Sequence, residues 1–189
     1  FLLASESLLE FSGEFGFEKS YLDFHYRSRH PDLIQFSNYA FYEGRLKPMM
    51  NIEEYKPISF KQVDGIYFEN TNKKEADEVI DILQNKIKRL PNGKYPSVGI
   101  ATFNISQRDL IIDEILKKRR GDSSKGFNEK MVEFEQEGFF VKNLENIQGD
   151  ERDVVILSTT YGVNTEGKFH KRFGQVNQQK GYKLLNVII

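Results

Sequence analysis

Apolar and polar residues alternate along the chain in blocks that predict strands separated by amphipathic helices. Strands are expected at residues 96–102, 139–144, 153–159 and 184–189, and residues 58–68 predict a further strand or bent pair. Strands that alternate with helices are typical of a parallel sheet with right-handed crossovers. We therefore predict an α/β fold with a mainly parallel sheet flanked by helices.

Two segments carry both a helix start signal and the apolar spacing of an amphipathic helix. Pro31 suits the first turn of a helix that runs to about Tyr42, because the N–H that proline lacks has no partner there. Asn72 and Glu75 form a capping-box pattern ahead of a helix that reaches about Arg89. The core-facing residues of this second helix are expected to be Ala76, Val79, Ile80, Leu83 and Ile87.

A third helix is predicted after Ser106, which has Asp109 at capping-box spacing. Its inward residues are expected to be Leu110, Ile111, Ile115 and Leu116. The polar residues 121–130 contain glycine and serine and predict a loop, as do residues 162–181. Residues 1–20 predict a short helix and a connector from a preceding domain.

Composition narrows the functional classes. The chain has 189 residues, a formal net charge of −1 and 29% charged residues, so nucleic acid would have to bind through a local patch. Cysteine is absent, which fits a cytoplasmic protein, and the three histidines show no metal-ligand spacing. No apolar run approaches the ~20 residues of a membrane span. The missing initiator methionine leads us to expect a piece of a longer protein.

The acidic segment 148–153, with the sequence Gln-Gly-Asp-Glu-Arg-Asp, lies directly before the apolar run 154–158. The β-branched run predicts a strand that is buried on both faces of a parallel sheet. Polar groups at the ends of such strands are where α/β proteins place ligands. Two other interpretations stay open. One is a Walker B box, although the acids of such a box follow a strand, and the other is a charged surface turn.

Two further segments match a known family together with this turn. Residues 24–46 contain Tyr-Arg-Ser at 26–28, an amphipathic helix, and Phe-Tyr-x-Gly-x-Leu at 41–46, and residues 181–189 form a largely apolar run. In this order, the three segments resemble motif IV, motif V and the strand before motif VI of the superfamily 1 DNA/RNA helicases. The resemblance implies that residues 21–189 are a three-layer RecA-like domain, the second motor domain, which ends before the motif VI arginine.

The resemblance implies that this domain supplies part of an ATP site. Tyr26 would stack on the adenine and Arg27 would contact the γ-phosphate, as suits a flat aromatic and a planar cation. Glu151 would bind the ribose, Gly149 would let the backbone approach the phosphates, and Gln148 would support the turn. The alternative for Arg27 is a surface salt bridge.

The resemblance also implies a track for single-stranded DNA or RNA. The residues expected to line it are Thr102, Asn104, Lys142, Asn143, Ser158 and Thr159. Asn143 stands where the family usually has threonine or serine, and an amide is still a donor to phosphate. Helix capping by Asn104 or Ser106 is an equally weighted alternative. For Asp153 we prefer a structural role, as an acid that caps a neighbouring backbone.

No phosphate-binding loop of the type Gly-x-x-x-x-Gly-Lys-[Ser/Thr] occurs, so the chain holds at most half an ATP site. The resemblance implies ATP with Mg²⁺, whose protein ligands would lie on a first RecA-like domain of the same longer chain. Lys168, Lys171 and Arg172 form a basic cluster that is either solvated surface or a phosphate contact. Two other classes are a RecA-like docking module without ATPase activity and a flavodoxin-like nucleotide-binding protein. The missing glycine-rich loop argues against the second.

Overall fold

The chain forms two compact units. The computed structural model describes residues 8–18, 20–26, 28, 30–48, 55–121, 125–169, 173–178, 181 and 184–185. Contacts group residues 1–59, with residue 189, into unit 1 and residues 60–188 into unit 2.

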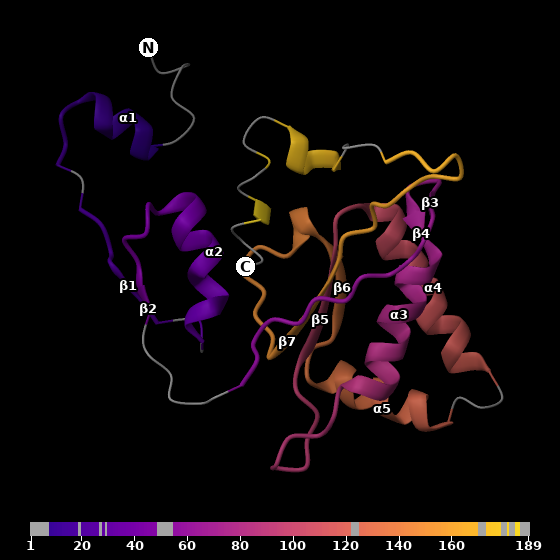
Figure 1. Cartoon of the computed structure of the whole chain (residues 1–189). Helices are drawn as coiled ribbons and strands as arrows, with labels where there is room; N and C mark the ends of the chain where they lie inside the picture. The colour runs from indigo at the N-terminus through magenta and orange to yellow at the C-terminus, as the bar shows by residue number, and fades with distance from the viewer. Residues whose placement is uncertain are drawn as a thin grey trace. The chain divides into compact units, whose positions relative to one another are not determined.

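Unit 2 is built on a parallel sheet (Figure 1). The central strand β5 (Val98–Thr102) pairs with β6 (Phe140–Asn143) on one side and with β7 (Val154–Ser158) on the other. In this register Thr102 lies opposite both Asn143 and Ser158, so the carboxyl ends of the three strands coincide. All of β5 is buried, as expected of a central strand.

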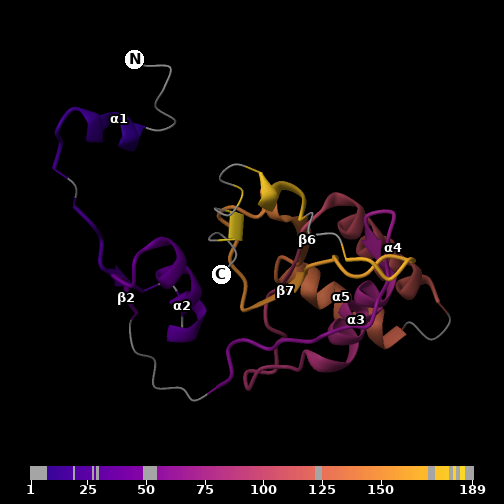
Figure 2. The same ribbon diagram turned by 45° about the horizontal axis from the view of Figure 1, so that its top comes forward.

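Helices cover one face of this sheet. They are α3 (Lys73–Asp81), which continues into a π-helical turn η1 (Ile82–Lys86), α4 (Ile105–Arg120) and α5 (Lys125–Gln136). Figures 1 and 2 both place α3, α4 and α5 on the same side of the strands. The core between them contains the five residues predicted for the second helix, namely Ala76, Val79, Ile80, Leu83 and Ile87. The α/β prediction with a parallel sheet flanked by helices is confirmed.

The other face of the sheet has a smaller core. Ala101 packs there with Leu144 and Ile147, which belong to or follow the short 3₁₀ turn η2 (Leu144–Asn146). The edge strand β7 leaves Val155 45% and Leu157 37% exposed. The prediction that this strand is buried on both faces is therefore wrong for the described residues, because only its helix-facing side is covered.

The polar segment 121–130 was predicted to be a loop, and this is wrong for its second half. Helix α5 begins at Lys125 and buries Phe127, Met131 and Phe134, which follow a spacing of four and three residues. A further 3₁₀ turn, η3 (Gly174–Asn177), lies within the predicted loop 162–181. In the sequence, the polar neighbours of Phe127 concealed the apolar stripe of α5.

Two of the predicted strands also differ from the structure. Of residues 58–68, only β3 (Tyr67–Phe68) pairs, antiparallel with β4 (Thr71–Asn72), and Ile58 and Phe60 are 51% and 86% exposed. Short apolar alternation without a covering layer does not hold a strand. Residues 184–185 are helical where a strand was predicted, and the rest of that segment lies outside the described residues.

Unit 1 contains α1 (Leu8–Glu14), α2 (Pro31–Phe41) and a two-residue parallel pairing of β1 (Phe24–His25) with β2 (Lys47–Pro48). The helix predicted at Pro31 is confirmed, with His30 as its N-cap. The amide of Asn38 then donates to the carbonyl of Leu46 and accepts from its N–H, both at 2.8 Å.

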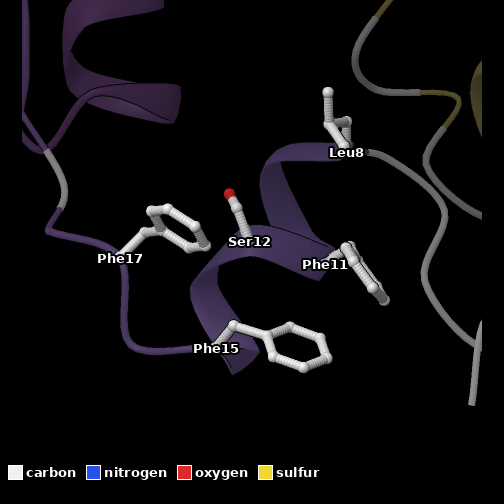
Figure 3. A pocket seen from close by; sticks show the side chains of 5 residues that line it. All are labelled: Leu8, Phe11, Ser12, Phe15 and Phe17. Atoms are coloured by element: carbon white, nitrogen blue, oxygen red, sulfur yellow. The ribbon is translucent and has the colours of Figure 1, made fainter.

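The helix predicted near the start of the chain is α1, and it carries an apolar hollow (Figure 3). The hollow is lined by Leu8, Phe11, Ser12, Phe15 and Phe17. The Phe11 and Phe15 rings are 4.7 Å apart, while Phe15 and Phe17 remain 64% and 69% exposed. Its lining offers no charged side chain to a ligand.

Candidate functional site

Polar side chains collect at the carboxyl end of the parallel sheet. Thr102, Asn143 and Ser158 end the three strands, and each is at most 1% exposed. Carboxyl ends of parallel strands are where ligands bind in open α/β sheets. Buried polar groups must find partners, so the partners of these three residues decide which of them is able to reach a ligand.

Gln107 is the centre of this polar cluster, a buried role that the sequence did not predict. It is fully buried on α4. Its Oε1 accepts from the Asn72 N–H at 2.8 Å, and its Nε2 donates to the Asn72 carbonyl at 3.2 Å and to Ser158 Oγ at 3.3 Å. The residue sits at the polar end of the helix stripe that continues with Ile111 and Ile115. A glutamine four residues before a buried apolar residue was the signal available.

The start of α4 differs from the prediction in a related way. Asn104, not Ser106, is the N-cap, and its Oδ1 accepts from the Gln107 N–H at 2.8 Å. The capping alternative for Asn104 is therefore realised. Leu116, predicted to face inward, is 41% exposed because the buried stripe starts at Gln107. Thr102 Oγ1 donates to the Asn104 carbonyl at 2.8 Å.

The residues expected at the end of β6 are also engaged within the chain. Asn143 donates to the Glu145 carboxylate at 2.8 Å and accepts from the Asn146 amide at 2.6 Å. Lys142 Nζ lies 2.6 Å from Asp150 Oδ2. A phosphate that bound Asn143 or Lys142 would have to compete with these partners.

The loop after β7 contains the most accessible residue of this cluster. Thr159 is exposed between Ser158 and Thr160, which are 1% and 0% exposed. The next residue, Tyr161, packs 5.2–6.2 Å, between ring centroids, from aromatic rings that belong to Tyr67, Phe103 and Phe173. Burial raises the pKa of the Tyr161 phenol, although the nearby Asn104 side chain partly offsets this effect. Tyr161 therefore stays neutral at physiological pH.

The predicted nucleotide-binding turn lies away from this end of the sheet. The connection between β6 and β7 runs back along the side of the sheet opposite α3, α4 and α5 to the start of β7 (Figure 1). Gln148, Gly149 and Glu151 are all exposed on it. Gly149 has a φ of +86°, which favours glycine, and a Cβ placed there would meet nothing within 4 Å. The turn thus presents open backbone and a carboxylate to solvent.

Asp153 has the structural role that the sequence suggested. Its Oδ2 accepts from the Ser97 N–H at 3.0 Å and from Ser97 Oγ at 2.8 Å, and its own N–H donates to Ser97 Oγ. These bonds tie the starts of β5 and β7 together. Because Asp153 lies at the amino end of its strand, the Walker B interpretation finds no support.

The motif IV residues lie in unit 1. Tyr26 is 78% exposed, as a stacking ring would have to be. Arg27 lies outside the described residues, as do Lys171 and Arg172 of the predicted basic cluster. Lys168 of that cluster forms an ion pair with Glu166, with Nζ and Oε2 3.0 Å apart.

The donor set of the described residues fits a nucleotide better than a metal ion. No group of three histidine, aspartate or glutamate side chains is placed to hold a metal within these residues. An exposed carboxylate at Glu151 and an open glycine backbone suit a ribose hydroxyl and a phosphate. None of the helices in the described ranges is long and apolar enough to cross a bilayer.

Comparisons with known proteins give one family model and two relatives. A protein-family model described as AAA domain matches residues 60–189. One relative, an uncharacterized ATP-dependent helicase (MG140) of Mycoplasma genitalium, is 35% identical over 188 residues. Its homolog in Mycoplasma pneumoniae is 33% identical over 187 residues. Each alignment covers 98% of this chain and 16% of the relative.

No solved structure matches the chain. The family assignment therefore rests on the sequence, and the parallel sheet of unit 2 agrees with it. Since the family model spans well over half of the residues, the chain belongs to the AAA domain family as a superfamily 1 helicase-like domain.

Proposed function

We propose that this chain is the C-terminal motor domain of a longer ATP-dependent helicase. It would supply half of an ATP site and part of a track for single-stranded DNA or RNA. The observation that carries the proposal is the separation of two accessible groups in unit 2. Glu151 is exposed on an open turn beside Gly149, and Thr159 is exposed at the carboxyl end of the sheet.

The nucleotide would be held by groups of complementary chemistry. The Glu151 carboxylate accepts a hydrogen bond from a ribose hydroxyl, and the backbone at Gly149 admits a phosphate without steric conflict. By the resemblance to motif IV, Tyr26 would stack on the base, and Arg27 would neutralise charge on the γ-phosphate. Hydrolysis of bound ATP would supply the free energy for movement along the strand. The Mg²⁺ ligands and the phosphate-binding loop belong, in this proposal, to a first motor domain.

The nucleic acid would be contacted by small polar groups that do not read sequence. The Thr159 hydroxyl is available to donate to a phosphate, while Ser158, Thr102 and Asn104 shape the strand end from within. Lys142 and Lys168 are already paired with acids, so a phosphate would have to compete with these acids for them. Binding by this domain alone is therefore expected to be weak and tolerant of sequence.

The proposal is tested by ATP hydrolysis in the full-length helicase. Arg27→Ala should lower strand-stimulated turnover by about 10³–10⁵-fold, the range for loss of an arginine finger. Arg120→Ala, at the exposed end of α4, is the matched control and should turn over like wild type. Wild-type turnover of Arg27→Ala would favour the alternative, a RecA-like docking module for nucleic acid or protein without an ATPase role.

A further inference from the structure

Glu75 makes contacts that ordinary helix capping does not explain. It lies in the first turn of α3, and its side chain crosses to the loop after β7. Its Oε1 accepts from Ser158 Oγ at 3.0 Å, and both carboxylate oxygens accept from the Thr160 N–H, at 3.1 and 2.9 Å. One carboxylate thus holds the residues on both sides of Thr159.

The N-cap N–H, which a glutamate at this position usually bonds, has a different partner here. In a capping box, the glutamate would accept from the N–H of the N-cap residue, here Asn72. Asn72 does cap the helix, because its Oδ1 accepts from the Glu75 N–H at 3.2 Å. Its own N–H, however, donates to Gln107. The Glu75 carboxylate therefore accepts hydrogen bonds from the loop after β7 in place of the Asn72 N–H.

The loop that Glu75 holds is strained. Thr160 has a φ of +73°, and the Tyr161 N–H donates to the Thr159 carbonyl at 2.8 Å. Together they make a γ-turn of the positive-φ kind, which is rare and unfavourable for a β-branched residue. Such a conformation persists only where the surroundings fix it. The two bonds from the Thr160 N–H to Glu75 are the contacts that do so most directly.

We propose that Glu75 is a positioning residue for single-strand binding, which holds the strained turn at Thr160 so that Thr159 faces the nucleic acid. This inference rests on the proposed function, because it needs Thr159 to contact the strand. Without Glu75, Thr160 leaves the left-handed region and Thr159 turns with it. Glu75 itself carries a negative charge and has no attraction for phosphate. Its contribution to binding therefore acts through Thr159.

The direction in which nucleic-acid affinity changes distinguishes a positioning role of Glu75 from an effect of its charge. Removing a carboxylate near a nucleic-acid surface strengthens binding if only charge matters, because like-charge repulsion falls. Positioning predicts the opposite change. Glu78→Ala removes the same charge one turn further along α3, where Glu78 pairs with Lys61 at 3.4 Å and has no hydrogen bond or ion pair to the β7 loop among the described residues. It is the matched control.

The test is a fluorescence anisotropy titration of the whole chain with a labelled oligothymidine. Glu75→Ala should raise the dissociation constant about tenfold and Glu75→Gln, which keeps one acceptor, about threefold. Glu78→Ala should leave it unchanged or slightly lower. Adding Thr160→Gly to Glu75→Ala should recover part of the affinity, because glycine adopts a positive φ without strain. A loss of affinity that came only from the change in charge predicts no such recovery.

Two outcomes overturn the inference, and they are distinguishable. If Thr159→Ala weakens binding while both Glu75 variants bind like wild type, the positioning role is wrong and the proposed track stands. If Thr159→Ala itself binds like wild type, the track through Thr159 is wrong, and the role of Glu75 falls with it. Circular dichroism melting of each variant identifies any that fails to fold. Glu75→Gln, which preserves the side-chain volume, then carries the test.

Discussion

The polar residues at the carboxyl end of the sheet in unit 2 differ in burial and in bonding from those in the turn before β7. Thr102, Asn143 and Ser158 are at most 1% exposed and are bonded within the chain, whereas Gln148 and Glu151 are exposed. No hydrogen bond or ion pair joins the Glu151 side chain to any other described residue. Substitution of Thr102, Asn143 or Ser158 is therefore expected to lower stability, whereas substitution of Gln148 or Glu151 is expected to weaken ligand binding alone.

The sharpest contrast in stability is between Gln107→Leu and Glu151→Ala. Leucine at position 107 would remove the partner of the buried Asn72 N–H and the Gln107 donor to the Asn72 carbonyl, and a buried group left unpaired costs about 1–3 kcal/mol. We expect the free energy of unfolding to fall by about 3 kcal/mol. Glu151→Ala should change it by less than about 0.5 kcal/mol, as is usual at an exposed site. Urea denaturation measures both values.

If Gln107→Leu and Glu151→Ala lowered the free energy of unfolding by the same small amount, the difference in stability between the two regions would be contradicted. Gln107→Glu is a useful third variant, because it keeps the volume and replaces the donor to Asn72 and Ser158 with an acceptor. It should be nearly as unstable as Gln107→Leu. A stable Gln107→Glu protein would mean that the amide donor does not matter.

A smaller effect is expected where α3 and α4 meet behind the carboxyl end. Glu114 accepts from Lys117 Nζ at 2.8 Å and lies 3.3 Å from Lys73 Nζ. The Lys117 bond, with a second contribution from Lys73, lowers the Glu114 pKa. A lowered carboxyl pKa stabilises the fold above the ordinary pKa of glutamate, and this contribution is lost as the pH falls through the lowered value.

Glu114→Gln should therefore lower stability by less than about 1 kcal/mol at neutral pH, since both lysines are largely exposed. The difference from wild type should vanish in acid. Glu129→Gln, at an exposed position of α5, is the control and should show no difference at either pH. A Glu114→Gln deficit that grows in acid would contradict the direction of the pKa shift.

Much of the fold could be predicted because the capping and apolar-spacing patterns in the sequence matched the residues that the structure buries. The cap at Asn72 and the apolar spacing from Ala76 to Ile87 gave α3 and its core face correctly. Helix α5 was missed because polar residues and Gly126 surround Phe127. The predicted strand at 58–68 mostly failed because Ile58 and Phe60 remain 51% and 86% exposed. Local pattern is informative only where another layer covers it.

The candidate site was less predictable than the fold. Asn104 and Asp153 were identified with the roles of cap and backbone acceptor among the alternatives. The roles of Gln107 and Glu75 depend on partners more than 30 residues away, as in the Gln107 bond to Asn72 and the Glu75 bonds to Thr160. A single sequence does not reveal such pairings, because they follow from how the strands and helices meet.

The central claim is that the two ends of the sheet serve different ligands. It is tested most directly by measuring the KM for ATP and the single-strand dissociation constant of the full-length helicase with Glu151→Ala and with Thr159→Ala. Glu151→Ala should raise the KM about tenfold at saturating strand and leave strand affinity within about twofold. Thr159→Ala should do the reverse. If both variants changed the same ligand's affinity, the separation of the two sites would be contradicted.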